Sequence, residues 1–548
     1  LLNYGCVGYP DVANAKCLLV WSCNPFHSGT SRARGLIQAI ENGMKVIEVG
    51  PLITPLTGRA DIHLRLRPGT SGALALGIAH VIINESLFDH EFVDNWTVGF
   101  SEYSNYVREF SPTNVEAITS VPAESIVRAA RMFAESKPAA IMSGASPTVH
   151  HTNAVQNHRA ITALIGLTGN FDRKGGNYVQ ATSYYHQPTG LPTREREFEQ
   201  VRPFEEMAPR IGQDVHPVWC RLVTEAQSMH IPFQINSKKP YPIRAMVGFG
   251  VNYRMWPGSD YMRDSLKKLD FMVDVDLFLT DTAKLADLVL PACSAFEKSD
   301  LRIWPSRYAI WTRPVISPVG EARSDIDIIA AMADRLGLND PLLSKGHEAC
   351  LDWIFEPAGL KIRDIKDHPE GCFLKNTKRP SHEKYKENGF PTPSGKMELT
   401  SSVLKEAGFD PLPRYTEPAL SPVSTPEVAQ TFPLVLTTGA RLPMFFHSRT
   451  FRLPWTRRLR PDPMVEIHPD DAEKRGIAEG DWVDLSTSKA SITVKANLTR
   501  KVPSGVVNML HGYPEADVNL LIEPDYRDPI SGFPGFKALL CEVSLKTV

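Results

Sequence analysis

The stretch CLLVWSCNPFHSGTSRARGLIQAIENGMKVIEVGP, residues 17–51, decides the fold class of the first part of the chain. It begins with an apolar run at 17–21, which ends in a polar turn at 22–25. A helical pattern follows at 32–42, and a second apolar run at 45–49 is closed by Gly50 and Pro51. Strand, loop, helix and strand in this order predict an α/β unit, in which a parallel sheet carries helices on both faces.

The alternation of predicted strands and helices continues to about residue 168, is interrupted, and resumes further along the chain. A short strand at 60–66, a helix at 72–84 capped by Thr70 or Ser71, a strand at 139–142 and a helix at 153–168 extend the first unit. The stretch 182–240 is polar and poorly periodic, and we expect a long excursion there. Strands at 243–250, 271–275 and 286–291 and a helix at 324–336 predict a second α/β unit that faces the first across a crevice.

In the last part of the chain, the spacing of apolar residues changes from a helical pattern to alternation. After an irregular connecting segment, short alternating runs appear as PLVLTTG (433–439), MVEIHP (464–469), DWVDLSTS (481–488) and SITVKANL (491–498). Short strands bounded by Gly, Pro and Asp are typical of a closed β-barrel. We therefore expect two α/β units at 1–240 and 241–345, a connecting segment at 346–430 and a barrel at 431–548.

Composition excludes several classes of protein. The 548 residues include 60 basic and 62 acidic side chains, and the net charge of −2 gives no reason to expect nucleic acid as a partner. No apolar run approaches the roughly 18 to 20 residues that span a bilayer. The eight cysteines contain no CxxC pair, so their spacing predicts neither a zinc ribbon nor an iron–sulfur cluster.

The polar loops after the strands are where an open parallel sheet binds ligands. The run GFGVNY at 248–253 follows a strand, but Tyr253 stands where a dinucleotide fingerprint has its third glycine, and there is no Walker A motif. A nicotinamide-dependent dehydrogenase is therefore disfavoured.

Six long motifs carry a resemblance that spacing alone does not give. They are WSCNP (21–25), PGTSGALALGIAHVIINE (68–85), LIGLTGNFDRKGGN (164–177), DTAKLADLVLPA (281–292), PTPSGKMEL (391–399) and TTGARLPMFFHS (437–448). In this order the sequence resembles the dimethyl-sulfoxide-reductase family of molybdopterin enzymes, near its acetylene hydratase, pyrogallol transhydroxylase and polysulfide reductase branches. The resemblance implies that each α/β unit binds one pterin guanine dinucleotide, that the barrel covers both, and that the metal is molybdenum or tungsten.

The resemblance also implies which residues contact the cofactors. For the first cofactor they are Cys23, Asn24, Pro51, Thr54, Gly69 and Ser71. For the second they are Gly250, Asn252, Asp274, Thr280 and Thr282. From the barrel they are Thr438, Gly439, Arg441, His447, Ser448, Asn519 and Lys537. Three positions depart from the family pattern: Gly50 and Ser71 stand where an aspartate is common, and Leu52 stands where an arginine is common.

The metal ligand is expected outside this chain. Cys6 is a candidate because thiolates suit such metals, but its segment resembles the one just after the ligand, so we expect Cys6 to pack. The start LLNYGCVGYPD has no basic region typical of a signal peptide, and we expect a missing N-terminal piece that carries the metal ligand and any iron–sulfur cysteines. The compartment stays open, with the cytoplasm slightly favoured over the periplasm.

The implied function is oxygen-atom, hydroxyl or two-electron transfer on a small-molecule substrate, with an iron–sulfur electron-transfer subunit as the partner that the resemblance suggests. Two alternatives stay open: a non-redox hydratase of the same family, and a cofactor-free subunit of a redox complex. Gly50, Leu52 and Ser71 motivate the second alternative, and the retained barrel motif argues against it. His150, His151 and His158 are either proton relays or ordinary polar residues around a helix start.

Overall fold

The computed structural model describes residues 1–144, 149–179, 207–223, 225–303, 308–356, 359–374, 382–445 and 447–546. The first unit is built on a four-stranded parallel sheet in the order β4-β3-β2-β6. The strands are β2 (Cys17–Trp21), β3 (Lys45–Val49), β4 (Ile62–Leu64) and β6 (Ala139–Ser143). All of these strands lie where the sequence predicts them.

Helices cover both faces of this sheet. Leu18 and Val20 belong to the apolar cluster that includes Leu36 of α2 (Thr30–Glu41). Leu19 and Trp21 point to the other face, because successive side chains of a strand alternate. They belong to the cluster that includes α3 (Ser71–Asn84), α7 (Ala123–Glu135) and α9 (Ala154–Leu167). The first half of the predicted architecture is confirmed.

The second unit is a three-stranded parallel sheet in the order β10-β9-β8, formed by β8 (Ala245–Phe249), β9 (Phe271–Asp276) and β10 (Leu288–Pro291). Helices α12 (Ile231–Ser237) and α13 (Ser259–Leu266) lie on one face and share an apolar cluster with Met272. On the other face, Val247, Phe271 and Leu288 are 40%, 47% and 46% exposed among the described residues. This face is exposed in part because the link between β9 and β10 contains only the 3-10 turn η5 (Ala283–Leu285), which is too short to cover it.

The connecting segment expected at 346–430, together with the last part of the range expected for the second unit, contains more regular structure than the sequence indicates. An antiparallel sheet of β11 (Asp300–Ile303), β12 (Tyr308–Thr312) and β13 (Cys372–Phe373) shares a small core with α15 (His347–Phe355) and α16 (Ile362–Lys366). Further on, β14 (Met397–Glu398) pairs with β5 (Thr97–Val98) and joins the core of the first unit. These elements are too short for their periodicity to stand out in the sequence.

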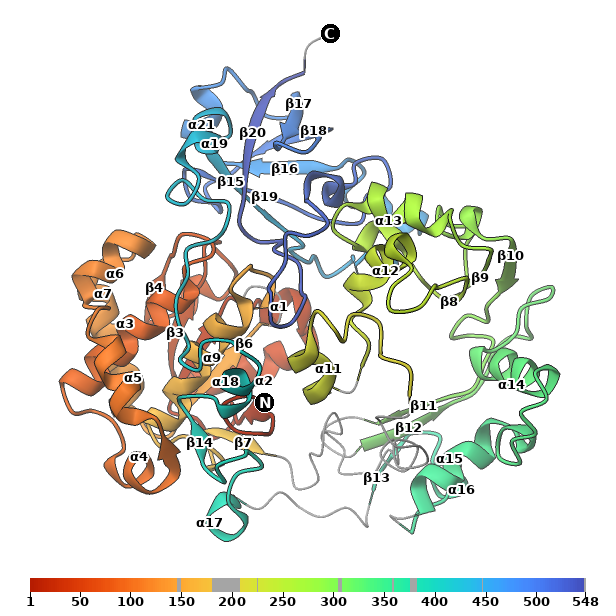
Figure 1. Cartoon of the computed structure of the whole chain (residues 1–548), viewed down its shortest axis with the longest axis horizontal. Helices are drawn as coiled ribbons and strands as arrows, with labels where there is room; N and C mark the ends of the chain where they lie inside the picture. Colours follow the sequence, from red (N-terminus) through yellow and green to blue (C-terminus); the bar gives the residue numbers. More distant parts are fainter. Residues whose placement is uncertain are drawn as a thin grey trace.

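The C-terminal domain is a closed barrel in the strand order β15-β19-β16-β18-β17-β20. Its strands are β15 (Leu434–Thr438), β16 (Met464–Ile467), β17 (Trp482–Ser486), β18 (Ser491–Leu498), β19 (Val506–Met509) and β20 (Leu539–Leu545). In Figure 1 the barrel lies at the top, in blue, with the first unit (red to orange) and the second unit (green) below it on either side. The expected order of two α/β units and a barrel is confirmed.

The remaining elements are short strands, helices and turns around these three bodies. They are β1 (Gly8–Pro10), β7 (Asn177–Val179), α1 (Pro25–Ser28), α4 (His90–Trp96), α5 (Phe100–Val107), α6 (Pro112–Thr119), α11 (Pro217–Val223), α14 (Asp325–Arg335), α17 (Tyr385–Asn388), α18 (Ser402–Glu406), α19 (Pro426–Thr431), α20 (Pro454–Arg457), α21 (Pro469–Glu473), and the 3-10 turns η1 (Thr57–Arg59), η3 (Ser228–His230), η4 (Tyr253–Met255), η6 (Leu343–Lys345) and η8 (Val518–Leu521). Part of the expected excursion at 182–240 lies outside the described residues. Across the described ranges, no helix has both the length and the hydropathy that a membrane span requires.

Candidate functional site

The first candidate surface is the edge where β2 and β3 end. Asn24 follows β2, and its side-chain oxygen Oδ1 is buried without a hydrogen-bond partner among the described residues. Burial raises the pKa of the neighbouring Cys23 thiol, so it stays protonated and uncharged at neutral pH. Ser71, at the start of α3, is 3% exposed and accepts a hydrogen bond from Nε1 of Trp21 at 3.2 Å. This edge therefore offers uncharged polar groups.

Pro51 and Gly69, which are also predicted at this edge, contribute through their backbones. The carbonyl of Pro51 accepts a hydrogen bond from Nε of Arg65 at 3.1 Å, and the same guanidinium donates to the carbonyl of Lys501 in the barrel at 3.1 Å. Gly69 has a φ of 90°, and a Cβ atom there would lie 2.3 Å from Cγ of Pro418. Glycine is required at this position both for its backbone angle and for the close packing.

The second candidate surface is the edge where β8 and β9 end. Gly250 has a φ of 63°, and Asn252 accepts from the Arg254 amide at 3.1 Å. The hydroxyl of Thr282 accepts from the Tyr253 amide at 3.2 Å, and that of Thr280 caps the following turn. These bonds fix the loop conformation. Asp274, within β9, is completely buried.

The barrel is hydrogen-bonded to the second edge. The carboxylate of Asp517, which is 6% exposed, accepts from the Ser259 hydroxyl at 2.6 Å and from Arg254 at 3.4 Å. The side-chain amide of Asn519 donates to the carbonyl of Arg254 at 2.6 Å. Of the seven barrel residues predicted to touch a cofactor, Asn519 is therefore the one placed at the second unit's loop.

The barrel is also hydrogen-bonded to the first unit. Nδ1 of His27, in α1, lies 3.0 Å from the carbonyl oxygen of Arg441. The amide of Ile53 donates to the carbonyl of Lys501 at 2.9 Å. The barrel thus contacts the polar edges of both sheets, as the resemblance implies.

Between these contacts lies a group of basic side chains. The ammonium of Lys537 donates to the carbonyl of Thr438, and burial, followed by the charge of Arg441, lowers the pKa of Lys537 to about 7. The guanidinium of Arg441 contacts Nε2 of His447, whose Nδ1 lies 3.0 Å from Nε2 of His511. We name these four residues, together with His150, the basic cluster.

The two remaining histidines of the basic cluster are held neutral. Burial, followed by His447, lowers the pKa of His511 to about 3, and burial followed by Lys537 does the same for His150. The Nδ1 atom of each ring is buried without a partner among the described residues. Since no ion pair of Lys537 occurs in the described part of the chain, the cluster is suited to an anionic ligand. A cavity of about 10 Å³ lies beside it, lined in part by Arg441 and His511.

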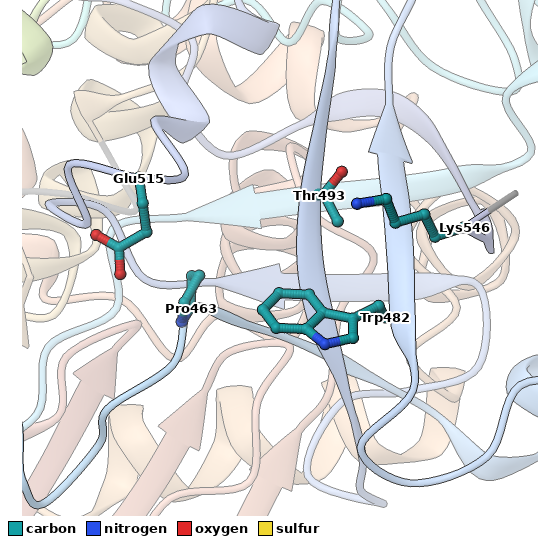
Figure 2. Close-up of a pocket in the computed structure, with 5 residues that line it drawn as sticks. All are labelled: Pro463, Trp482, Thr493, Glu515 and Lys546. Atoms are coloured by element: carbon teal, nitrogen blue, oxygen red, sulfur yellow. The ribbon is translucent and has the colours of Figure 1, made fainter. Parts of the chain in front are cut away.

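A larger recess, of about 310 Å³, lies on the outer wall of the barrel. Figure 2 shows the five side chains that line it: Pro463, Trp482, Thr493, Glu515 and Lys546. None of them belongs to a loop at either sheet edge, and Trp482 is 46% exposed. We therefore place the candidate site at the sheet edges and the basic cluster.

The structure divides the predicted residues into three groups: the first edge, the second edge and the basic cluster. Thr438 donates its hydroxyl to the carbonyl of Phe536 at 3.1 Å, Gly439 lies beside His511 and Lys537, and Ser448 packs against Gly512. Sequence reasoning missed His511. The signal available for it was its place two residues after β19, where a barrel strand opens into a loop.

No group of three metal-ligating side chains occurs within the described ranges. Cys6 packs against the core of the first unit, with its Sγ 3.4 Å from the carbonyl of Tyr4, and burial raises its pKa to about 11. This environment disfavours a thiolate. The buried, unpartnered polar atoms of Asn24, Asp274 and His511 fit a long ligand that carries both hydrogen-bond donors and negative charge.

Comparison with known proteins places this architecture. A family model of molybdopterin oxidoreductases matches residues 3–335, and a model of the molybdopterin dinucleotide-binding domain matches residues 434–540. The chain belongs to the molybdopterin oxidoreductase family. The second matched region covers most of the barrel and every residue of the basic cluster except His150. Members of this family bind molybdopterin guanine dinucleotide with molybdenum or tungsten.

Three relatives show the breadth of that family. Acetylene hydratase of Syntrophotalea acetylenica is 30% identical over 93% of this chain and 72% of that protein. The F420-dependent formate dehydrogenase subunit alpha of Methanocaldococcus jannaschii is 29% identical over 98% of the chain and 77% of that protein, and the dimethyl sulfoxide reductase DmsA of Escherichia coli is 28% identical over 93% and 69%. The solved structure of acetylene hydratase from Pelobacter acetylenicus superposes with a TM-score of 0.89 at 27% identity, covering 100% of this chain and 80% of that one.

Proposed function

We propose that this chain binds two pterin guanine dinucleotides with one molybdenum or tungsten ion, and that it catalyses oxygen-atom, hydroxyl or two-electron transfer on a small molecule. One observation carries the proposal: a single barrel is hydrogen-bonded to the polar edges of two parallel sheets. Two sheet edges under one cover suit two dinucleotides that meet at their pterin ends.

The residues of this chain bind and orient the cofactors in this proposal. The loops after β2 and β8 hold the nucleotide ends with Cys23, Asn24, Gly250 and Asn252, and the barrel holds the phosphates and pterins with the basic cluster. When bound, the metal and its pterins supply the redox or Lewis-acid chemistry. Because phosphates favour the charged form of Lys537, the low pKa of that ammonium is expected to rise on binding.

The composition of the purified protein tests the proposal. From a host that makes the cofactor, we expect about one molybdenum or tungsten atom and about two guanine nucleotides per chain, measured by elemental analysis and by acid release of GMP. A chain that folds normally in such a host and carries neither supports the cofactor-free subunit instead.

A non-redox hydration is the second candidate, and the similarity to acetylene hydratase in sequence and structure favours it. Hydration consumes water and transfers no net electrons to an external partner. Product formation on a small unsaturated substrate that stays constant when artificial electron acceptors are added or left out supports hydration, whereas strict dependence on an acceptor or donor supports a redox reaction. For a redox reaction, we propose an iron–sulfur electron-transfer subunit as partner.

A further inference from the structure

The recess of about 310 Å³ on the outer wall of the barrel takes no part in the proposed function. Pro463 and Trp482 form its apolar part, and in Figure 2 Glu515 and Lys546 lie on opposite sides of these two residues. Trp482 is 46% exposed, so the recess is open to solvent without any movement of the chain. Its volume is at the lower end of the range for small-molecule sites and suits one large side chain.

Helix α20 is attached to the rim of this recess. Arg457, the last residue of α20, forms an ion pair with Glu515. The helical backbone hydrogen bonds continue past the end of α20, so Trp455, Arg458 and Leu459 share the side that points away from Arg457. Trp455 is 66% exposed and Leu459 is 65% exposed. Large apolar side chains therefore lie open both in the recess and on the helix at its rim, as is typical of a surface that binds another molecule.

The charges of this surface do not balance. Its acids have cationic partners within the chain, since Asp462 pairs with Lys495 at 2.6 Å and Glu515 is paired with α20. Arg458 and Lys546 are both exposed, and neither forms an ion pair with any other residue that the structure describes. The surface therefore combines exposed aromatic rings with an excess of positive charge, and a negatively charged partner is complementary to it.

We propose that the outer wall of the barrel binds an acidic segment of a partner protein, which places one aromatic or large aliphatic side chain against Trp482 while its carboxylates pair with Arg458 and Lys546. Tryptophan and arginine are the residue types that contribute most at protein interfaces. A membrane surface fits less well, because α20 is a single turn and carries no amphipathic stripe. A second copy of this chain also fits less well, because a two-fold interface would bring the same cations together.

Binding of a set of fluorescent peptides to the full chain tests the proposal. The first peptide has one phenylalanine between runs of glutamate, the second has serine in place of the phenylalanine, and the third has lysines in place of the glutamates. By fluorescence anisotropy, we expect the first peptide to bind about tenfold more tightly than either of the others, because only it offers both the ring and the charge. Its affinity should fall about threefold or more between low and physiological salt, because exposed charges are screened.

Two variants locate the binding to this surface. Trp482→Ala should weaken binding of the first peptide about tenfold, and Arg458→Glu should weaken it about three- to tenfold. Phe296→Ala is the matched control and should bind like the wild type, because Phe296 is 65% exposed but lies between β10 and β11, outside the barrel. Since the side chain of Arg458 is exposed, Arg458→Glu preserves the test if the melting curve shows that Trp482→Ala does not fold.

Several results would overturn the proposal. They are equal affinity for the peptides, binding of none of them, and binding that neither variant weakens. Stronger binding of phosphatidylglycerol vesicles than of the first peptide, lost in Trp482→Ala, would assign the surface to a membrane instead. Dimerisation of the wild type in analytical ultracentrifugation, lost in the same variant, would assign it to a second copy of the chain.

Discussion

Replacing Lys537 by Met tests whether the buried charge of Lys537 lowers the stability of the cofactor-free chain. In the folded, cofactor-free chain burial lowers the pKa of Lys537 to about 7, whereas a lysine in an unfolded chain titrates near 10.4. The unfolded chain therefore binds more protons between these two values. Stability must rise as the pH rises from about 7 toward 10, because deprotonation removes the cost of burying the charge.

The size of this effect follows from the linkage. One proton corresponds to a slope of at most about 1.4 kcal/mol per pH unit, so the interval from pH 7 to 9 corresponds to about 2–3 kcal/mol. The residue Lys537 as a whole keeps some exposed surface although its ammonium is buried, so we take about half of that, roughly 1 kcal/mol. The Lys537→Met variant should lack this component while keeping most of the apolar packing of the side chain.

Urea denaturation of the cofactor-free chain at a series of pH values measures the difference between wild type and variant. We expect the wild type to gain stability relative to Lys537→Met between pH 7 and 9, and cofactor-loaded protein to show little of this trend. Lys546→Met, at an exposed barrel lysine, is the control and should follow the wild type. A constant difference between wild type and Lys537→Met across the whole range would refute the reasoning.

Three further outcomes follow from the structure. Glu48→Gln should lower the free energy of unfolding by about 1–3 kcal/mol in urea titrations, because two short hydroxyl bonds lose a charged acceptor; unchanged stability would contradict this. Arg254→Met should cost about 3–5 kcal/mol and open the junction of barrel and second unit to proteases, because it leaves the buried carboxylate of Asp517 without its cationic partner. Arg263→Met, at an exposed pair, is the control and should change little. The wild type should lose stability as the pH falls below about 6.5, because the unfolded chain then binds a proton at His511 that the folded chain, with a pKa near 3, does not. His511→Gln should reduce that loss in melting curves recorded at a series of pH values. Identical curves for wild type and variant would exclude His511 as the cause.

Strand positions in the α/β units and barrel were predictable from sequence because they depend on local order. The run at 45–49 is an apolar strand between turn residues, and the structure has it at the same bounds. The segment at 346–430 was not predictable in the same way. Its helices α15 and α16 have nine and five residues, too few turns for an apolar stripe to stand out, and their core forms only with β12 and β13.

The candidate site was predictable in its positions and not in its pairings. Sequence order places Arg441 and His447 in one loop, but the hydrogen bond between His447 and His511 depends on the closure of the barrel, which brings β15 beside β19. Likewise, the sequence does not show that the two strand acids Glu48 and Asp274 have different hydrogen-bond partners. Two threonine hydroxyls of the loop after β3 donate to Glu48, whereas neither oxygen of Asp274 has a partner among the described residues.

These pairings make the basic cluster electrostatically complementary to an anionic ligand. The pKa of Lys537 is lowered to about 7, and the pKa of the buried Asp274 is raised to about 6. Both shifts have burial as their largest cause, and each lowers the stability of the cofactor-free chain. A ligand that offers phosphates to Lys537 would remove the first of these penalties, so on the proposed function loading and stability are linked. On the proposed function the cofactor-free chain is therefore less stable than the loaded protein.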